Sequence, residues 1–331
     1  MDSVTTHTRA RMNNRFEDLL PNSTDPAKAK IRARMVMILN SQGEIVPAAK
    51  SPLGKLWRLV NDAKSSLDDC EEVIHLDPAL TSRIFRVANS AAYHARATDV
   101  AEAIRFIGFK RVRELVFNAG VLSQLSSLKT PPEMELFWLR NIFVARLSER
   151  ICSLYFSTDG CEYLAGLIHD IGWLFLTSYF PAEYGKIMAS EKSPCDAEKE
   201  FLPFGHANIA AALAARSAMP LRAVDAIAYH HKQMLTTTST LVAPNQNPLF
   251  LGIILSVCDK LADASQLDFL GKSKMTMQEF RECPEVVWLQ NFQQQVDFET
   301  MAVEELTKSQ EIYQVFFSDD TPGASAAPTN G

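Results

Sequence analysis

The stretch GLIHDIGWLFL at residues 166–176 places an adjacent histidine and aspartate, His169 and Asp170, inside a long apolar run. The run extends from about Cys161 to Tyr179, which is helix length. Neighbouring side chains on a helix point about 100° apart. His169 and Asp170 can therefore reach one point only where the helix faces a pocket or ends there, and Gly172 leaves room for close approach. We expect this segment to form one wall of a pocket in a helical protein.

The same helical periodicity continues through most of the chain. Asp77-Pro78 is typical of a helix start, with Asp as the N-cap and Pro in the first position. Gly108 is placed to end a helix in a left-handed conformation. No stretch alternates with period two for long enough to predict a strand, so we predict an all-α fold, a helical bundle. The expected helices cover residues 27–39, 53–60, 78–88, 100–107, 112–119, 137–154, 161–179, 206–217, 221–231 and 249–264, with one or two more within 286–317.

Four segments are expected along the chain. Residues 1–44 read as a helical or flexible N-terminal appendage and residues 45–265 as the main domain. Residues 266–317 read as C-terminal helices that pack on this domain, and residues 318–331 as a disordered tail rich in Asp, Pro, Gly, Ala and Ser. Inside the domain, the polar stretch 232–248 reads as a surface loop.

Composition narrows the class of protein. The chain has 331 residues, 47% of them hydrophobic and 22% charged, which is typical of a globular protein. A formal net charge of −6 gives no general attraction to nucleic acid or to an anionic membrane, so we expect neither as a partner. The six cysteines are scattered and form no C-x-x-C pair, which favours free thiols in a reducing compartment. Since no signal peptide is visible and the apolar run 249–258 is too short for a membrane span, we expect a cytoplasmic protein.

The histidines are unevenly placed. Of seven in the chain, four lie between residues 169 and 231, each on or at the end of an apolar helix. Nitrogen and oxygen donors on facing helices of a bundle are what a divalent metal such as Fe, Mn or Mg requires. The candidate ligands are His169, Asp170, His206, His230, His231 and Asp259.

Several motifs in order resemble the HD-related output domain family, abbreviated HDOD. Besides GLIHDIGWLFL, they are IHLDPALTSRIFRVANSAAY (74–93), AIRFIGFKRVRELV (103–116, with Ile107 for a leucine), FGHANIAAALAARSAMP (204–220, with Ala210 for a glycine) and AIAYHH (226–231). The resemblance runs from about Ile45 to Ala264. It implies an all-α bundle related to HD-type metal-dependent phosphohydrolases. It also implies a bacterial signalling or regulatory module that has lost hydrolase activity.

Two departures from the parent hydrolases bear on the chemistry. The slot of a ligand histidine, on the helix before His169, is taken by Arg140, which stays protonated and cannot bind a metal. The His230-His231 pair is not followed by the G-Y-P motif of the HD-GYP phosphodiesterases. The remaining residues could still hold one metal with a ligand lost. Alternatively, Arg140 itself balances Asp170 and Asp259, which is the arrangement we favour.

The function expected from these features is a non-catalytic signal-transduction module with a degenerate HD-type pocket. It would act through a signalling protein partner or a small ligand. A homodimer is also possible. In this reading no cofactor is needed. The alternative is a metal-dependent phosphohydrolase acting on a nucleotide or cyclic dinucleotide. A metal at His169 and Asp170 would then lower the pKa of a bound water.

Overall fold

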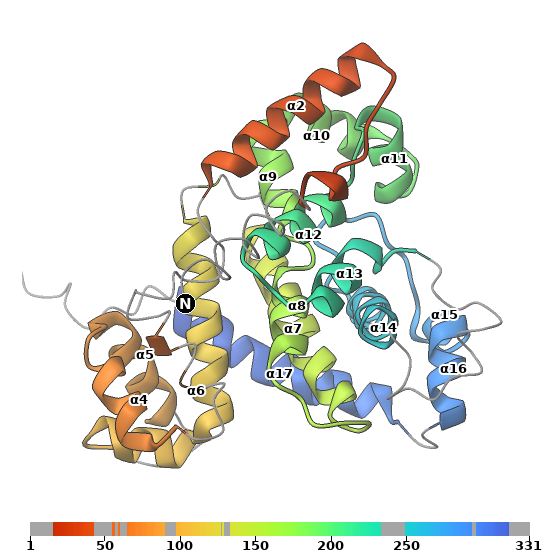
Figure 1. Cartoon of the computed structure of the whole chain (residues 1–331). Coiled ribbons are helices and arrows are strands. Elements are labelled where there is room, and N and C mark those ends of the chain that lie inside the picture. The colour runs from red at the N-terminus through yellow and green to blue at the C-terminus, as the bar shows by residue number, and fades with distance from the viewer. Residues whose placement is uncertain are drawn as a thin grey trace, which may run out of the picture.

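The computed structural model describes residues 16–42, 55–56, 59, 65–89, 97–126, 128, 133–232, 249–292 and 296–317. Every regular element in these ranges is a helix, which confirms the all-α prediction (Figure 1). Of the expected helix 53–60, only Lys55, Leu56 and Leu59 are described. The predicted tail 318–331 and most of the predicted loop, residues 233–248, lie outside the described ranges.

The helices form a small lobe and a large lobe. The small lobe contains α4 (Leu67–Ile74), α5 (Pro78–Ala88) and α6 (Val100–Leu125) around its own apolar core. The large lobe is built on α7 (Met134–Cys152), α8 (Cys161–Ile168), α9 (Gly172–Tyr179), α10 (Pro181–Ala189), α11 (Pro194–Phe201), α12 (His206–Arg216), α13 (Leu221–Tyr229) and α14 (Phe250–Ala264). The flanking elements are η1 (Glu17–Leu19), α2 (Pro26–Ser41), α15 (Met277–Arg281), α16 (Pro284–Phe292) and α17 (Phe298–Phe317).

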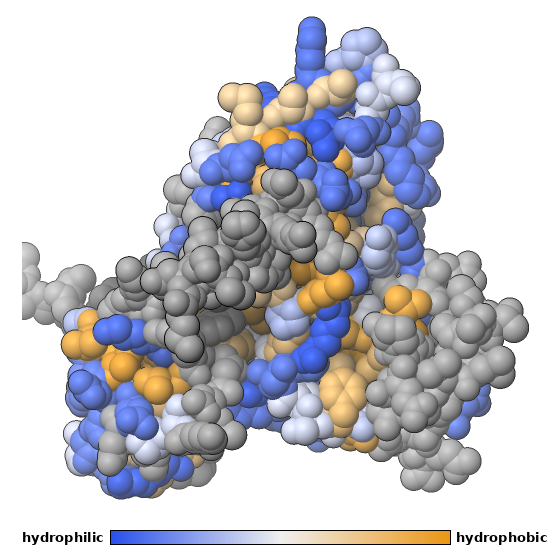
Figure 2. Space-filling view, viewed as in Figure 1, coloured by the Kyte–Doolittle hydropathy of each residue, from blue (hydrophilic) through white to orange (hydrophobic). Residues whose placement is uncertain are grey.

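One apolar core runs through the large lobe and its flanking elements. Leu39 of α2, Phe280 of α15 and Met301 of α17 all belong to it. The domain boundaries predicted at residues 44 and 265 stay predictions. The core contains residues from both sides of each boundary and does not mark either one. Figure 2 shows hydrophilic residues over α2, α10 and α11 and some apolar surface on the small lobe. None of the helices in the described part of the chain has the length and apolar content needed to cross a bilayer.

Local signals in the sequence place the small-lobe helices. The Asp77 side chain accepts a hydrogen bond from the Leu80 amide at 3.0 Å, and Pro78 opens α5, as predicted. Gly108 leaves the helical conformation with φ 79° and ψ 154°. Gly108 therefore separates two helical segments within α6, as predicted, with a positive φ but an extended ψ instead of the left-handed helical value.

The predicted single helix 161–179 is wrong. Residues 169–171 form a tight turn between α8 and α9, in which the Ile171 and Trp173 amides bond to the carbonyls of Ile168 and Asp170. The turn brings His169 and Asp170 out of the helical ladder toward one point. Apolar periodicity misses it because the residues on both sides are equally buried.

α17 joins the two lobes. Figure 1 shows it crossing the lower part of the molecule from the α15–α16 side to the small lobe. Its buried Glu305 forms ion pairs with Arg146 and Arg150 of α7, each at 2.7 Å. At its end, Val315 enters the small-lobe core. α17 therefore fastens the small lobe to α7 by both charge and apolar contact.

We predict that Gly172→Ala lowers the free energy of unfolding. A β-carbon at Gly172 would lie 2.0 Å from the carbonyl oxygen of His206, so α9 and α12 would have to separate. The expected loss is about 1–3 kcal/mol, the usual cost of overpacking. Gly185→Ala is the control, because nothing lies within 4 Å of its β-carbon and alanine favours a helix. Urea unfolding of the two variants measures the difference, and equal stabilities would contradict the close approach.

We predict that Glu305→Gln lowers the free energy of unfolding by about 3 kcal/mol, because it removes the buried carboxylate that Arg146 and Arg150 share and leaves Arg146 with Glu114 alone. The control is Glu304→Gln in the more exposed pair with Arg150, expected to cost under about 1 kcal/mol.

This contribution of Glu305 depends on pH. Burial raises the pKa of Glu305, but Arg146, Lys308 and Arg150 outweigh it and hold the pKa below its ordinary value. A lowered folded-state pKa stabilises the protein above the unfolded pKa and stops doing so as the pH falls. The stability gap between the unmodified chain and Glu305→Gln should therefore shrink below about pH 4.3. A gap that widens on acidification would contradict the assignment.

Candidate functional site

The six predicted ligand residues and Arg140 converge in the large lobe. His169 and Asp170 lie in the α8–α9 turn, and His206 is the first residue of α12. His230 and His231 follow the end of α13, and Asp259 and Arg140 lie within α14 and α7. All are buried except His231, whose side chain is 32% exposed. Helix ends thus supply most of the site, which lets side chains from separate elements meet.

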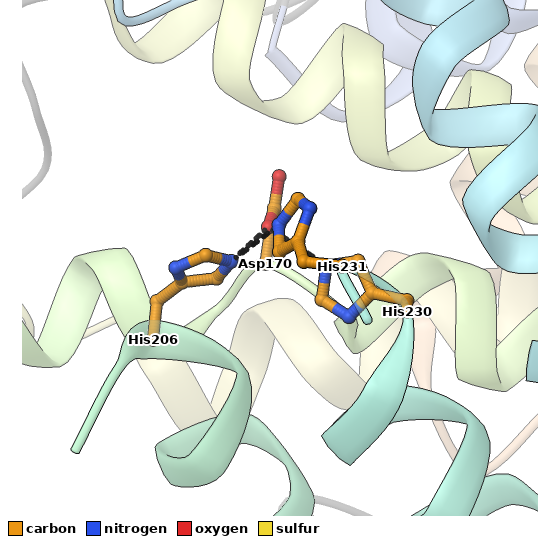
Figure 3. A group of neighbouring side chains, drawn as sticks. All are labelled: Asp170, His206, His230 and His231. Atoms are coloured by element: carbon orange, nitrogen blue, oxygen red, sulfur yellow. Dashed lines mark hydrogen bonds and ion pairs between the residues drawn. The ribbon is translucent and has the colours of Figure 1, made fainter. Parts of the chain in front are cut away.

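Asp170 lies at the centre of three histidines (Figure 3). Its Oδ1 is 3.2 Å from His206 Nε2 and 3.8 Å from His230 Nε2. The Nε2 atoms of His206 and His231 are 3.0 Å apart. One ligand atom from each of these four residues lies within 4.8 Å of the others, so the group could hold a metal ion.

Backbone carbonyls orient the rings of His169 and His230. The Nδ1 atoms of His169 and His230 each donate to a carbonyl, of Gly166 and Ile227, at 2.7 Å. A carbonyl can only accept, so both rings carry a proton on Nδ1 and turn Nε2 toward the centre. This is the arrangement that metal-binding histidines adopt.

His206 is held by residues that the sequence did not point to. Its Nδ1 lies 2.9 Å from Glu198 Oε1, and its backbone amide donates to the same oxygen at 2.7 Å. Trp173 stacks on the imidazole with ring centres 4.6 Å apart. Glu198 is buried on α11, and no spacing in the sequence relates it to His206.

The Arg140 guanidinium is already bound to carboxylates. Nη2 pairs with Asp259 Oδ1 at 2.6 Å and Nη1 with Asp263 Oδ1 at 2.7 Å, while Nε lies 3.5 Å from Asp170 Oδ2. Burial lowers the pKa of Arg140, but these three carboxylates outweigh it and raise the pKa above its ordinary value. Arg140 therefore stays charged. Asp263 was also missed, although its i+4 spacing from Asp259 on one helix face could have indicated it.

Asp170 divides the site into two halves. On one side, His169, Asp170 and Asp259 form a second group close enough to hold a metal, and the Arg140 guanidinium contacts both of its carboxylates. Here His169 Nε2 lies 3.2 Å from Asp259 Oδ1. On the other side, Asp170 meets His206, His230 and His231, with no arginine or lysine among them. We call these the arginine half and the histidine half.

The histidine half fits a divalent metal. His230 Nε2 is buried and has no hydrogen-bond partner among the described residues, and the buried Asp170 Oδ1 faces the imidazole nitrogens of His206 and His230. Buried polar atoms are costly unless an ion, a water or another polar group satisfies them. A carboxylate and three imidazoles also suit iron, manganese or zinc.

The carboxylates also act on the histidine rings themselves. Burial lowers the pKa of His169, but Asp170 and Asp259 outweigh it and raise the pKa to about 9. Burial likewise lowers the pKa of His206, which Glu198 and Asp170 raise to about 10. A cation in the histidine half would compete with a proton for Nε2 of His206.

The site opens into a cavity of about 850 Å³. Its walls include Lys232, Lys260 and Lys272 as well as Asp263 and Asp268. This volume is in the usual range for small-molecule pockets, about 300–1,000 Å³. A small ligand bound beside His231 could contact both the positively charged lysines and the negatively charged aspartates of the cavity wall.

Comparison with known families gives a match over the region that contains most of the site. The family model described as HDOD domain matches residues 46–233. This is more than half of the chain and includes the α8–α9 turn, His206 and the His230-His231 pair. Asp259 lies beyond the matched residues.

One curated relative is an uncharacterised protein of Treponema pallidum (strain Nichols). It is 26% identical over 201 residues, which are 56% of this chain and 37% of that protein. The chain thus matches little more than a third of that relative's length.

Solved structures share the fold at low identity. An HDOD domain protein of unknown function from Geobacter sulfurreducens superposes with a TM-score of 0.65 at 20% identity, covering 86% of this chain and 98% of that one. A protein of Shewanella amazonensis SB2B, provisionally named a phosphohydrolase, gives 0.61 at 20% identity, covering 86% and 97%. A protein of Marinobacter aquaeolei VT8, provisionally named a signal transduction protein, gives 0.58 at 17% identity, covering 93% and 66%. At these identities the likeness is one of fold alone.

We predict that Arg140→Ala lowers the free energy of unfolding by about 3–5 kcal/mol, because it leaves Asp259 and Asp263 buried without their cation. Arg281→Ala is the control, since it breaks an exposed ion pair with Glu299 and should cost under about 1 kcal/mol. Thermal and urea unfolding give both values. A loss at Arg140 no larger than that at Arg281 would show that the carboxylates do not depend on the guanidinium.

Proposed function

The chain belongs to the HDOD domain family, and on this premise we propose that it is a non-catalytic signal-transduction module with a degenerate HD-type pocket. It acts by binding a signalling protein partner or a small ligand. The provisional naming of the Marinobacter structure for signal transduction agrees with this class of function.

The observation that carries the proposal is the position of the Arg140 guanidinium. It lies against Asp259 and Asp170, the carboxylates that a metal in the arginine half would bind. A guanidinium neutralises carboxylates, but it has no open coordination position and cannot lower the pKa of a water as a metal does. The arginine half therefore supplies charge balance and no activated nucleophile.

The histidine half keeps a binding role in this proposal. Asp170, His206, His230 and His231 would hold a divalent metal such as iron or manganese, and a metal there would supply Lewis acidity. The chain's own part is to present these groups rigidly, through Glu198 and Trp173 behind His206 and the backbone carbonyl behind His230. His231, at the edge of the cavity, is the member best placed to meet a ligand.

The four-residue group of the histidine half also favours a second candidate, a metal-dependent phosphohydrolase acting on a nucleotide or cyclic dinucleotide. In that case a single metal in the histidine half would have to support hydrolysis, because Arg140 contacts the carboxylates that would bind a second metal. The two functions differ in whether a metal in this pocket produces turnover.

We also place the protein in the cytoplasm. All six cysteines are free thiols, and four of them are buried in the apolar cores. Thiols in this state are typical of a reducing compartment.

The deciding experiment is an assay of a chromogenic phosphodiester with added Mn²⁺, Fe²⁺ or Mg²⁺, combined with metal analysis of protein purified without added metal. We expect the unmodified chain to hydrolyse the phosphodiester no faster than His206→Ala, whether or not it binds a metal. Metal-dependent turnover in the unmodified chain that His206→Ala abolishes would overturn the proposal in favour of the phosphohydrolase. Circular dichroism of the variant confirms that the comparison is between folded proteins.

A further inference from the structure

A second cavity lies between the two lobes, away from the His–Asp pocket. It has a volume of about 450 Å³ and takes its walls from α5, α6, α7, α9 and α17. Most of the wall is apolar, and its largest side chains are Trp138, Phe316 and Phe317. The volume is within the range for small-molecule sites. An occupant would contact both lobes and the helix that joins them.

Arg83 of α5 is the one cation among the lining residues of this cavity. Its guanidinium carbon lies 4.7 Å from the centre of the Phe316 ring, and its side chain is partly buried. In the described part of the chain, Arg83 forms no ion pair or hydrogen bond. Arg111, Arg146 and Arg150 of the nearby charged cluster, by contrast, all pair with glutamates.

The acidic residue in the same wall, Asp77, acts on Arg83 electrostatically but forms no ion pair with it. The carboxylate of Asp77 caps α5 by accepting from the Leu80 amide. The cavity therefore combines a single unpaired guanidinium with extended apolar surface. A guanidinium binds a carboxylate through two parallel hydrogen bonds, and more strongly where water is partly excluded.

The apolar part of the wall selects the rest of the ligand. Phe317 stacks on Trp138 with ring centres 6.1 Å apart, and Leu122 and Leu125 face the same cavity from α6. The apolar part of the wall gains free energy by covering hydrocarbon. We propose that this cavity is a binding site for a small amphipathic monocarboxylate, with its carboxylate on Arg83 and its apolar body between the two lobes.

This site is distinct from the His–Asp pocket and does not rest on the function proposed for it. The two are connected through shared helices. Trp138 is two residues from Arg140 on α7, and Leu174 of the cavity wall follows Trp173, which stacks on His206. A ligand in the cavity would therefore contact α7 and α9, two helices that also position residues of the His–Asp pocket.

The test uses the full chain and octanoate as the probe, with octylammonium as the probe of equal length and opposite charge. Isothermal titration calorimetry should give saturable one-to-one binding of octanoate. Arg83→Gln should weaken this binding by about tenfold or more, the usual effect of losing a charged hydrogen bond. Arg105→Gln, which removes an exposed cation of α6 outside the cavity, should leave binding unchanged.

A second variant guards against a fold defect in Arg83→Gln. Leu122→Trp fills the cavity without touching its charge, and it should abolish octanoate binding as well. The proposal is overturned if octanoate shows no saturable binding, if octylammonium binds equally well, or if Arg83→Gln weakens binding no more than Arg105→Gln does.

Discussion

The ion pairs of Arg140 with Asp259, Asp263 and Asp170 are the interaction on which the rest of the large lobe depends. A buried guanidinium between three carboxylates joins α7, α14 and the α8–α9 turn at one point. Charges taken out of water need such mutual compensation, because each alone would be costly to bury. In an HD-type hydrolase a metal would supply the compensation. Here the Arg140 side chain supplies it.

α7 connects this centre with the remainder of the molecule. Arg140 is near its start, while Arg146 and Arg150 further along bind Glu305 of α17. Trp138 on the same helix packs against Phe317 at the other end of α17. The small lobe is thus attached to the pocket-bearing lobe through a helix whose contacts are charged in the middle and apolar at the end. α6 is a second connection, because Val112 and Leu115 lie in the small-lobe core while Phe117 and Val121 lie in the core of the large lobe.

Much of the fold and most of the site could be predicted from the sequence, and the failures have physical causes. Apolar periodicity located the helices because each buries one face, and the His169-Asp170 pair, His206 and the His230-His231 pair stood out as polar residues in apolar surroundings. The same periodicity could not reveal the turn at residues 169–171, since burial on both sides is complete. Glu198 could not be predicted, because tertiary packing brings it to His206 and no regular sequence spacing relates the two residues. The expectation that Arg140 would meet Asp170 and Asp259 is confirmed by their ion pairs. Its third partner, Asp263, lies one helical turn after Asp259 on the same face of α14, a spacing that could have indicated it.

We propose that the Arg140 guanidinium takes the place of a metal in the arginine half of the pocket. Anomalous scattering at the manganese edge, from crystals soaked in Mn²⁺, tests this directly. We expect no anomalous peak between His169, Asp170 and Asp259, where the Arg140 side chain should be ordered in contact with the carboxylates. Any peak in the pocket should lie among Asp170, His206, His230 and His231. A peak bridging His169, Asp170 and Asp259, with Arg140 turned away from them, would show that the guanidinium does not replace the metal.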